Sequence, residues 1–308
     1  VAFILFFRTV SNHRPQDSGK NKLEDWVFVV IAGATGLLLA LLINFGMTLF
    51  LALKSASPEV PPDFDQRFLT LETWGFLVLF VWGFSAKWLP IFLGLRPVHG
   101  RVLLLAVGLN SLGVLASLAN RMLVGAVLLL AGMIAATYGL RLFEAPERPA
   151  KVKGVHSSFP LFIRFGYVWG LIAAALGVWA GLVEESHGIW GASRHALTVG
   201  FLATMVFAVG QRILPAFSGM RLLFSTKLMF LSLPLLTVGC LLRVGSTIAG
   251  VQGFAGWAWP WTPLSAVTDS TAFSACSINL LYPFAPLPPL KYACNQLSRS
   301  PRRSRLGK

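Results

Sequence analysis

The chain has 308 residues, of which 55% are hydrophobic and only 12% are charged, and its mean hydropathy is +0.69. A soluble domain carries about 25% charged residues, so this composition excludes an ordinary soluble protein and favours one that lies in a lipid bilayer. The formal net charge of +14 does not indicate nucleic-acid binding, because the cations lie in the connections between apolar runs and not on a soluble basic face.

Residues 1–24 come before the first long apolar run and consist of a short apolar stretch followed by basic residues. The apolar part, 1–7, is too short for the central region of a complete secretory signal sequence. It resembles the last turns of a helix whose beginning is missing. We therefore expect 1–24 to be the remnant of a truncated helix, and we expect the transmembrane domain at 25–250.

Seven apolar runs approach the length of about 20 residues that a helix needs to cross the hydrocarbon core. The third run is short, and the seventh contains Arg243. In chain order the runs are 26–53, 69–89, 102–118, 122–140, 165–183, 196–214 and 228–250. The sequence therefore predicts an all-α, polytopic membrane protein with about seven transmembrane helices.

The connections between these runs alternate in charge. Lys and Arg are frequent before the first run and after the second, fourth and sixth runs. The opposite side holds only Lys54, Arg67, Arg121 and Arg194. Since cytoplasmic connections carry the excess of basic residues, the pattern predicts a cytoplasmic N-terminus. The regular alternation through seven runs also supports the predicted number of helices.

One ten-residue pattern occurs twice, at 87–96 and at 212–221. Both copies follow Lys/Arg-x-Leu-Pro-x-Phe-x-Gly-x-Arg, in which a cation and a proline end an apolar run and a glycine turns the chain. Such self-similarity indicates duplicated architecture. Because four runs separate the copies, we expect the second and third helices to be parallel equivalents of the sixth and seventh.

Only one histidine lies on a predicted helix. It is His195, at the start of the sixth run; the others are His13, His99, His156 and His187. Imidazole is the usual axial ligand of haem iron and a common ligand of copper. A histidine at the membrane edge can also simply anchor the end of a helix, and both interpretations stay open. The repeat places Thr70 where His195 stands, so it supplies no second histidine.

Three cations fall within or at the ends of the predicted helices: Lys87, Arg212 and Arg243. Charged groups within a membrane are costly and point to function, but Lys87 and Arg212 lie beside the two prolines, close enough to reach lipid head groups by snorkelling. Arg243 lies deeper. No phosphate-binding loop, dinucleotide fingerprint or catalytic-triad pattern occurs, so the sequence does not decide whether the protein is an enzyme.

The segment 251–308 is rich in Pro, Ser and Arg, and we expect it to be irregular. After seven helices its basic end would lie on the outer side, contrary to the charge rule. Two explanations stay open: a reading frame that is shifted after about Trp259, or a genuine disordered tail. Cys240, Cys276 and Cys294 have no CxxC spacing and predict no metal site.

Residues 193–221 contain Arg194-His195-Ala-Leu-Thr198-Val-Gly200 and, later, Gln-Arg212-Ile-Leu-Pro215-Ala-Phe-Ser-Gly219. In these residues the chain resembles the NnrS family, which consists of multi-span proteins of the bacterial inner membrane associated with haem, copper and relief of nitric-oxide stress. It is more weakly similar to the catalytic subunits of haem-copper oxidases. The histidine-rich motif that the NnrS family carries in an early helix has no counterpart in this chain.

This resemblance implies a bacterial inner-membrane protein with a role in the response to nitric oxide and nitrogen oxides or in haem–copper metabolism. His195 would be the ligand of haem iron or copper, and Arg194 would balance a haem carboxylate. Two other functions stay open: a multi-span transporter of a small molecule or ion, and a structural subunit of an oxidase-like complex with other membrane subunits as partners. The lipid bilayer is the partner that composition itself indicates.

Overall fold

The structure is a computed structural model that describes residues 24–54, 62–151, 155–183, 187–217, 225–251 and 261–281. Throughout these ranges the chain forms helices joined by turns, without a strand. The chain divides into two compact units. Unit 1 is Val1–Lys151 with Ala174–Glu185, and unit 2 is Val152–Ala173 with Ser186–Lys308.

Seven helices in the described ranges are long and apolar enough to cross a membrane. They are Asp25–Lys54, Phe64–Leu93, Gly100–Leu118, Met122–Gly139, Phe159–Leu182, Gly188–Ile213 and Lys227–Gly250. Each predicted apolar run coincides with one of these helices, including the short third run and the seventh run with Arg243. The protein is therefore an all-α, multi-pass membrane protein, as the sequence predicts.

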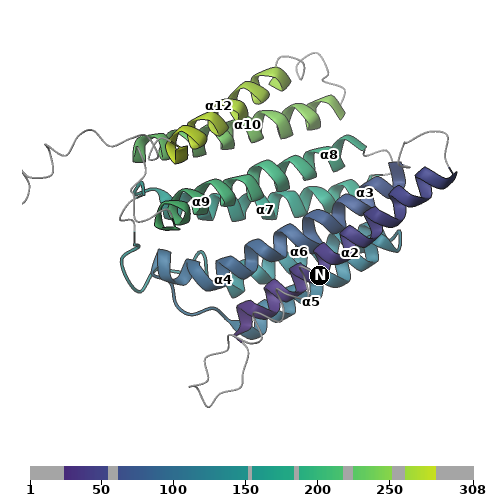
Figure 1. Ribbon diagram of the computed structural model, residues 1–308, viewed down its shortest axis with the longest axis horizontal. Coiled ribbons are helices and arrows are strands. Elements are labelled where there is room, and N and C mark those ends of the chain that lie inside the picture. Colours follow the sequence, from purple (N-terminus) through teal and green to yellow (C-terminus); the bar gives the residue numbers. More distant parts are fainter. Residues whose placement is uncertain are drawn as a thin grey trace, which may run out of the picture. The chain divides into compact units, whose positions relative to one another are not determined.

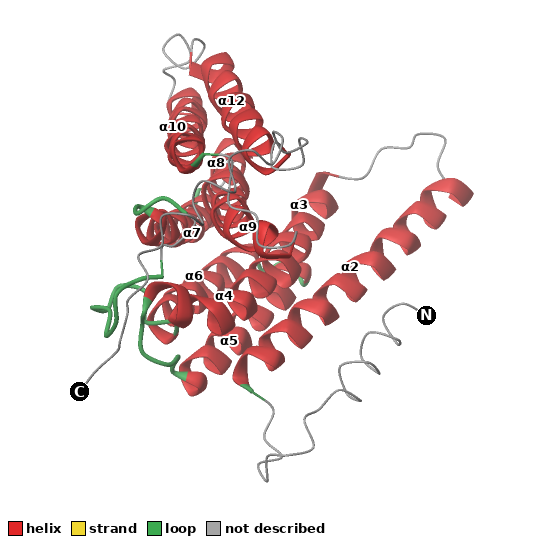
Figure 2. Ribbon diagram, turned by 60° about the vertical axis from the view of Figure 1, so that its left-hand side comes forward, coloured by secondary structure: helices red, strands yellow, loops and turns green. Residues whose placement is uncertain are grey.

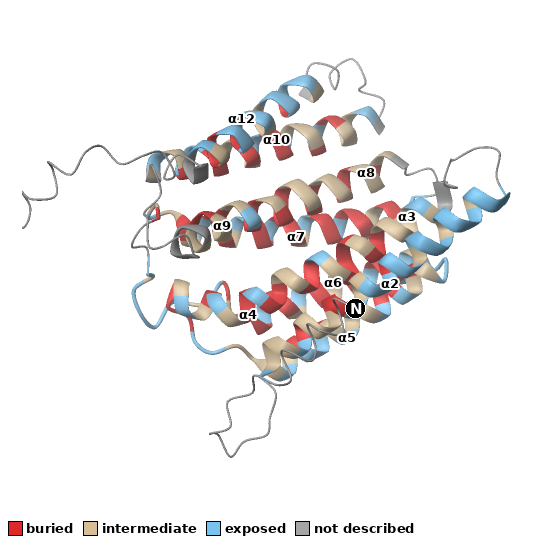
Figure 3. Cartoon of the chain, viewed as in Figure 1, coloured by how far each residue is buried: buried red, intermediate tan, exposed pale blue. Residues whose placement is uncertain are grey.

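The helices present large apolar side chains at their surface. On α2 (Asp25–Lys54), Phe45 is 69% exposed and Leu53 is 75% exposed, and the end of this helix is pale blue in Figure 3. Lipid tails accept such side chains, and a helix satisfies its own backbone hydrogen bonds. The exposed apolar surface therefore agrees with a bilayer environment.

Unit 1 contains α2, a long helix in three parts, and a hairpin of two helices. The long helix consists of α3 (Pro62–Thr70), the π-helical segment η1 (Leu71–Val78) and α4 (Leu79–Leu93), and the hairpin consists of α5 (Gly100–Leu118) and α6 (Met122–Gly139). α2 packs along η1 and α4, and α5 packs along α6 (Figure 1). A Cβ atom on Gly36 of α2 would overlap the carbonyl group of Gly75 in η1, so the backbones of α2 and η1 are in close contact.

Glycines also bring α5 and α6 together. Gly125, Gly132 and Gly139 form a stripe on α6 that faces α5. A Cβ atom on Gly132 would lie 3.2 Å from the carbonyl oxygen of Ala106, and one on Gly139 would lie 3.2 Å from the backbone nitrogen of Leu103. Small residues let membrane helices approach closely and gain van der Waals contact, so this stripe is a packing feature.

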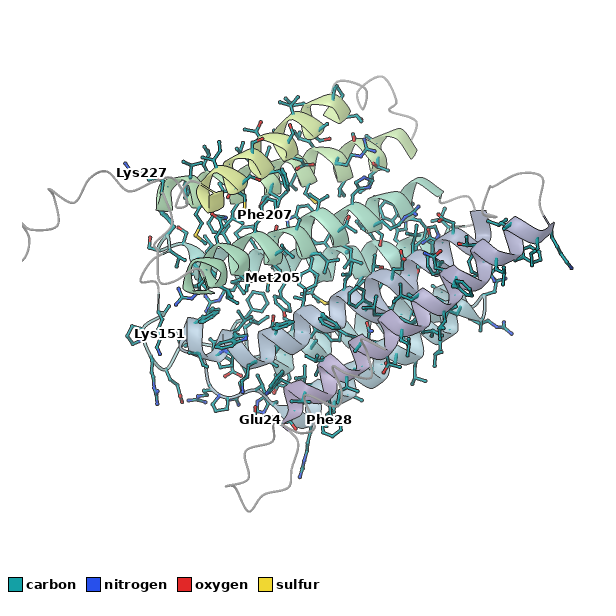
Figure 4. All side chains as sticks on the ribbon, viewed as in Figure 1. Glu24, Phe28, Lys151, Met205, Phe207 and Lys227 are labelled. Atoms are coloured by element: carbon teal, nitrogen blue, oxygen red, sulfur yellow. The ribbon has the colours of Figure 1, made fainter. Side chains whose placement is uncertain are left out.

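Unit 2 has the same kind of components. The first part of α7 (Phe159–Leu182) is followed by α8 (His187–His195), the π-helical segment η2 (Ala196–Ala203), α9 (Thr204–Phe217), α10 (Thr226–Val251) and α12 (Trp261–Leu281). Figures 1 and 2 show α10 and α12 side by side. Met205 and Phe207 lie on opposite sides of α9 (Figure 4): Met205 approaches Gly166 of α7, and the ring of Phe207 lies 6.2 Å from that of Phe273 in α12.

The two long helices repeat one element order. Each part of the first long helix begins 125 positions before its counterpart in the second (187 minus 62). The paired starts are Pro62 of α3 and His187 of α8, Leu71 of η1 and Ala196 of η2, and Leu79 of α4 and Thr204 of α9. Both helices therefore carry a π-helical segment of eight residues at the same place. Segments of this kind are frequent at functional sites. The predicted repeat is confirmed at this level, and it begins well before the ten-residue pattern.

The first copy of the pattern ends a helix as predicted. Pro90 lies within α4, which continues to Leu93, and Gly94 then adopts the left-handed conformation with φ of 68°. The backbone N–H of Leu95 donates to the carbonyl oxygen of Pro90 at 3.1 Å and closes the turn. In the second copy, Pro215 lies within α9, whereas Gly219 lies outside the described residues.

The prediction that 251–308 is irregular is wrong for Trp261–Leu281, which form α12. This helix is rich in Ser and Thr, and their hydroxyls donate to carbonyl oxygens of the preceding turn, as Thr271 does to Val267 at 2.7 Å and Ser274 to Ser270 at 2.9 Å. Hydroxyls satisfied in this way tolerate an apolar environment, although they lower the hydropathy of the sequence. The expected helix remnant before residue 24 and the segment 282–308 lie outside the described residues.

Candidate functional site

His195 lies where α8 ends and the π-helical segment η2 begins. It is seven residues from the start of the candidate span Gly188–Ile213, which corresponds to about 10 Å along the helix axis. Arg243 on α10 lies seven residues from the end of the candidate span Lys227–Gly250. Both side chains therefore belong to the interior of membrane-spanning helices, at a similar distance from a helix end.

Both ring nitrogens of His195 have partners. Nδ1 lies 2.7 Å from the carbonyl oxygen of Gly191, and because a carbonyl only accepts, Nδ1 carries the hydrogen. Nε of Arg243 donates to Nε2 at 3.3 Å, and because arginine only donates, Nε2 keeps its lone pair. The two contacts together define a neutral imidazole that is protonated on Nδ1.

α12 brings a carboxylate to the same part of α10. A Cβ atom on Gly239 would overlap Oδ1 of Asp269, so this side chain rests on the α10 backbone one turn before Arg243. Arg243 acts electrostatically on the carboxylate, although the ion pairs of the described residues do not include these two. Oδ1 is buried and has no hydrogen-bond partner within the described ranges. Arg243 and Asp269 on neighbouring helices thus interact electrostatically, without an ion pair among the described residues.

Cys240 completes this group of side chains. It is fully buried on α10, and its thiol donates to the carbonyl oxygen of His195 at 3.7 Å. His195, Cys240, Arg243 and Asp269 form what we call the polar cluster of unit 2. It joins three helices, α8, α10 and α12, at the beginning of a π-helical segment.

The corresponding place in unit 1 has the same backbone framework and a different side chain. Thr70 donates to the carbonyl oxygen of Gln66 at 2.9 Å, just as His195 donates to that of Gly191, four residues earlier in each case. The next turn agrees as well, since Thr73 and Thr198 donate to the carbonyls of residues 69 and 194 at 2.7 and 2.8 Å. A hydroxyl therefore takes the place of the imidazole.

A second pair of equivalent contacts lies at the other end of the repeated helices. Nζ of Lys87 lies 4.8 Å from the ring centroid of Trp26, at the start of α2, and 2.8 Å from a carboxylate oxygen of Glu24. Cζ of Arg212 lies 5.5 Å from the ring centroid of Phe159, at the start of α7. Each repeat cation covers an aromatic ring at the start of the preceding helix, so both cations have protein partners besides the lipid head groups expected for them.

The structure does not bring together all the residues that the sequence predicted for the site. Arg194, expected beside a haem carboxylate, is half-buried next to His195, and the cation that contacts the imidazole is Arg243. His99 stacks on Tyr138, and His156 lies against Phe230, with ring centroids 5.8 and 4.7 Å apart. The side chain of His187 and the whole of His13 lie outside the described residues.

Sequence reasoning missed two acidic residues on these helices, Glu72 and Asp269. Glu72 lies in η1, inside the second predicted run, and a search of each run for carboxylates as well as cations would have found it. Asp269 lies on α12, in the segment that was expected to be irregular. Its role depends on a helix that hydropathy did not predict.

The donor set decides how well the site fits a haem or a metal ion. In the described part of the chain, no group of three or more His, Cys, Asp and Glu side chains is able to hold a metal ion. Among the histidine side chains that the structure describes, His195 has the arrangement of a ligand, since Nδ1–H is held by a carbonyl and Nε2 keeps a lone pair. His195 would hold a haem iron through Nε2 only after Arg243 leaves that atom, and a copper site would need further ligands from outside the described ranges.

A protein-family model matches residues 69–280, and its description is "Domain of unknown function (DUF8744)". The match covers more than half of the chain and includes both π-helical segments and the whole polar cluster. The chain belongs to the DUF8744 family. Comparison with curated proteins and with solved structures finds no match.

The DUF8744 match also bears on the end of the helical region. It continues in frame through Trp259 and along α12 to residue 280. The match supports a genuine segment up to residue 280, and the hypothesis of a reading frame that is shifted after about Trp259 stays a prediction. Asp269 belongs to the DUF8744 domain, as do His195 and Arg243.

Proposed function

We propose that this DUF8744 protein is an NnrS-like protein of the bacterial inner membrane with a role in the response to nitric oxide and nitrogen oxides or in haem–copper metabolism. The observation that carries the proposal is the hydrogen bond from Nδ1 of His195 to Gly191, because it leaves the lone pair on Nε2, which accepts from Arg243 in this structure, inside a candidate span. A bound haem would supply an iron for redox or gas-binding chemistry. His195 would hold it, and Arg194 would balance one of its carboxylates.

Haem and metal content tests this proposal directly. The full chain is purified from membranes, and its reduced-minus-oxidised absorbance and metal content are measured. We expect haem or copper in the wild type and its loss in His195→Thr, which installs the residue of unit 1 and keeps a donor for the carbonyl of Gly191. His99→Ala is the control, because His99 stacks on Tyr138 away from the polar cluster. A wild type without haem or copper, or a His195→Thr variant with full content, contradicts the proposal.

The proposed orientation places the N-terminus in the cytoplasm and makes α12 an eighth span. α12 has 21 residues, or about 31 Å at 1.5 Å per residue, which matches the hydrocarbon core. It packs along α10 as α6 packs along α5. With eight spans, the basic residues after α12, among them Arg299, Arg302 and Arg303, fall on the cytoplasmic side and agree with the charge rule.

Thiol labelling tests this orientation. In a variant with Cys240→Ala and Cys276→Ala, a membrane-impermeant maleimide should label Cys294 in inverted vesicles and not in intact cells. Arg121→Cys and Arg148→Cys serve as outer and inner markers. Labelling of Cys294 in intact cells would show that α12 does not span the membrane. A second set, Arg96→Cys and Arg221→Cys, should report the same side if the repeats are parallel.

A transporter of a small ion is the second candidate, and one observation favours it. Arg243 and Asp269 place opposite charges on neighbouring helices of unit 2, next to an interruption of regular α-helix by η2. Charged side chains in membrane helices mark ion and substrate pathways, and transport sites use interrupted helices. Counterflow of a labelled ion into vesicles that contain the purified chain would distinguish a transporter from a structural subunit.

A further inference from the structure

We propose that this protein pairs in the membrane with a second copy of its own chain, through the face of α2 that carries Asn44. The inference goes beyond the proposed function and does not depend on haem, copper or transport. Its basis is an exposed amide inside a membrane-spanning helix, whose hydrogen-bonding groups no other helix of the described chain satisfies.

The depth of Asn44 in the bilayer gives the first argument. α2 begins at Asp25 and ends at Lys54, so it is about 45 Å long and exceeds the hydrocarbon core by about 15 Å. Asn44 lies ten residues before Lys54 (54 minus 44), or about 15 Å along the helix axis. With both charged ends in the head-group layers, the amide falls about 8 Å inside the hydrocarbon, where no water satisfies it.

The hydrogen bonds of Asn44 give the second argument. The hydroxyl of Thr48, one turn later, donates to Oδ1 of Asn44 at 3.3 Å. The two N–H groups of Nδ2 have no acceptor among the described residues, and Oδ1 is able to accept a second bond. An amide without partners is costly in hydrocarbon, so this side chain requires a partner that offers both an acceptor and a donor.

The packing of α2 leaves this face open. All buried residues of α2 lie at or before Ala40, and its later part is largely pale blue in Figure 3. Leu41, Asn44 and Thr48 are exposed, and they follow one another at spacings of three and four residues. Residues with this spacing form the contact between two paired helices, so a second helix is able to pack along the face that contains the amide.

A second copy of the chain is the partner that fits, because an amide is complementary to itself. All copies insert into the membrane with the same orientation, so the α2 helices of two copies are parallel and their Asn44 side chains lie at the same depth. A two-fold axis between the helices brings these two side chains together, and each Nδ2 then donates to Oδ1 of the other copy. Hydrogen bonds between polar side chains associate helices in membranes.

The number of chains in each membrane particle tests the proposal on the wild type. The full chain is expressed at a low level and extracted from its membrane in polymer-bounded lipid discs, and the mass of each disc gives the number of chains. We expect two chains per disc. Any other content, such as a single chain or a single chain with a different protein, contradicts the proposal even if every variant fails to fold.

Cysteine cross-linking tests which face of α2 forms the contact. In a chain whose three native cysteines are replaced by alanine, Leu41→Cys should form a disulfide-linked dimer when membranes are mildly oxidised, because residue 41 lies about 60° from Asn44 around the helix. Leu42→Cys is the matched control. Leu42 is 59% exposed and Leu41 is 52% exposed, but residue 42 lies about 160° from Asn44. Equal cross-linking at the two positions would overturn the assignment of this face.

Two substitutions of Asn44 test the role of the amide. Asn44→Leu removes the hydrogen bonds at similar size and should weaken the association about three- to thirtyfold, as expected for such bonds between membrane helices. Energy transfer between copies labelled at Arg148→Cys, measured in vesicles as lipid dilutes the protein, gives this change. Asn44→Gln keeps an amide and should associate more tightly than Asn44→Leu.

The unfolding of the single chain separates association from folding. Dilute detergent separates the copies, so Asn44→Leu should keep the thermal midpoint of the wild type in detergent while its association in vesicles weakens. Unchanged association of a folded Asn44→Leu variant would overturn the role of the amide.

Discussion

Units 1 and 2 have the same succession of helix, interrupted helix and hairpin, but they differ at the start of the π-helical segment. In unit 1, Thr70 donates to the preceding turn, and Asn110 of α5 donates to the carbonyl oxygen of Trp74 at 2.9 Å. In unit 2, His195 makes the bond to the preceding turn, and Arg243 of α10 contacts its free nitrogen. The contacts of Thr70 and Asn110 join neutral groups, although Glu72 also lies in η1, whereas the contact of His195 with Arg243 joins two ionisable side chains.

This difference separates structural residues from candidates for function. Bonds that occur in both units, such as those from Thr73 and Thr198, hold the interrupted helix. An imidazole can replace the hydroxyl of Thr70 because both donate to a carbonyl four residues earlier. One substitution therefore adds a titratable group without a new backbone arrangement. What is specific to unit 2 is the set of side chains that surrounds this group.

The largest expected effect concerns the stripe of glycines on α6 that faces α5, and it tests whether the stability of unit 1 depends on that stripe. Gly132→Leu places a side chain against Ala106 and Asn110 of α5, and overpacking that shifts the backbone typically costs about 1–3 kcal/mol and occasionally more. We expect a large loss of folded protein by size-exclusion chromatography and a lower midpoint of thermal unfolding. Gly108→Leu is the matched control, because a Cβ atom there meets nothing within 4 Å. Equal stability of the two variants would show that the glycine stripe of α6 packs loosely on α5.

The next effect concerns the polar contact that unit 1 has in place of the ionisable cluster. Asn110 is fully buried, and its side chain donates to the carbonyl of Trp74 in η1. Asn110→Leu should lower the free energy of unfolding by about 0.5–2 kcal/mol, the usual range for such bonds between membrane helices. Thermal unfolding in detergent measures this change. Asn44→Leu, on the exposed side of α2, should leave stability unchanged, and an equal loss there would refute a specific role for Asn110.

Exchange of the equivalent residues sharpens the comparison further. His195→Thr and Thr70→His should each change the free energy of unfolding by less than about 1 kcal/mol, because both side chains are able to donate to the preceding turn. Haem or copper binding should be lost in His195→Thr and should not arise from Thr70→His alone. Thermal unfolding and the haem and metal content of the same samples measure both properties. A large loss of stability in His195→Thr would favour the anchoring role of His195.

The smallest expected effect is a dependence of the stability of unit 1 on pH in the acidic range. The hydrogen bond from Lys87, followed by that from Trp26, lowers the pKa of Glu24 below its ordinary value of 4.5. A lowered pKa in the folded state contributes stability above the ordinary value, and this contribution disappears as the pH falls through the folded-state pKa. The pair is exposed, so we expect at most about 1 kcal/mol. Unfolding midpoints of wild type and Glu24→Gln should therefore converge as the pH falls below 4.5 and differ above it, and Lys87→Met should reduce the difference, because the bond from Trp26 remains.

Much of this fold follows from the sequence, because the number and position of the spans depend on local properties. A run of about 20 apolar residues is sufficient to predict a membrane helix, and the pattern around Pro90 and Pro215 predicted the repeat. The same local reasoning failed for α12, whose Ser and Thr residues lower its hydropathy while their hydroxyls bond within the helix. The π-helical segments leave no comparable signal in the sequence.

The sequence by itself determined that this is an all-α membrane protein with a duplicated helix, and that His195 is the one histidine on a predicted span. Only the tertiary structure decided what surrounds that histidine. Arg243 contacts it across 48 positions of the chain, and Asp269 lies against Gly239 of α10 from a helix that hydropathy did not predict. Such contacts depend on which faces of α8, α10 and α12 pack together, and packing between helices depends on shape complementarity that no single segment encodes.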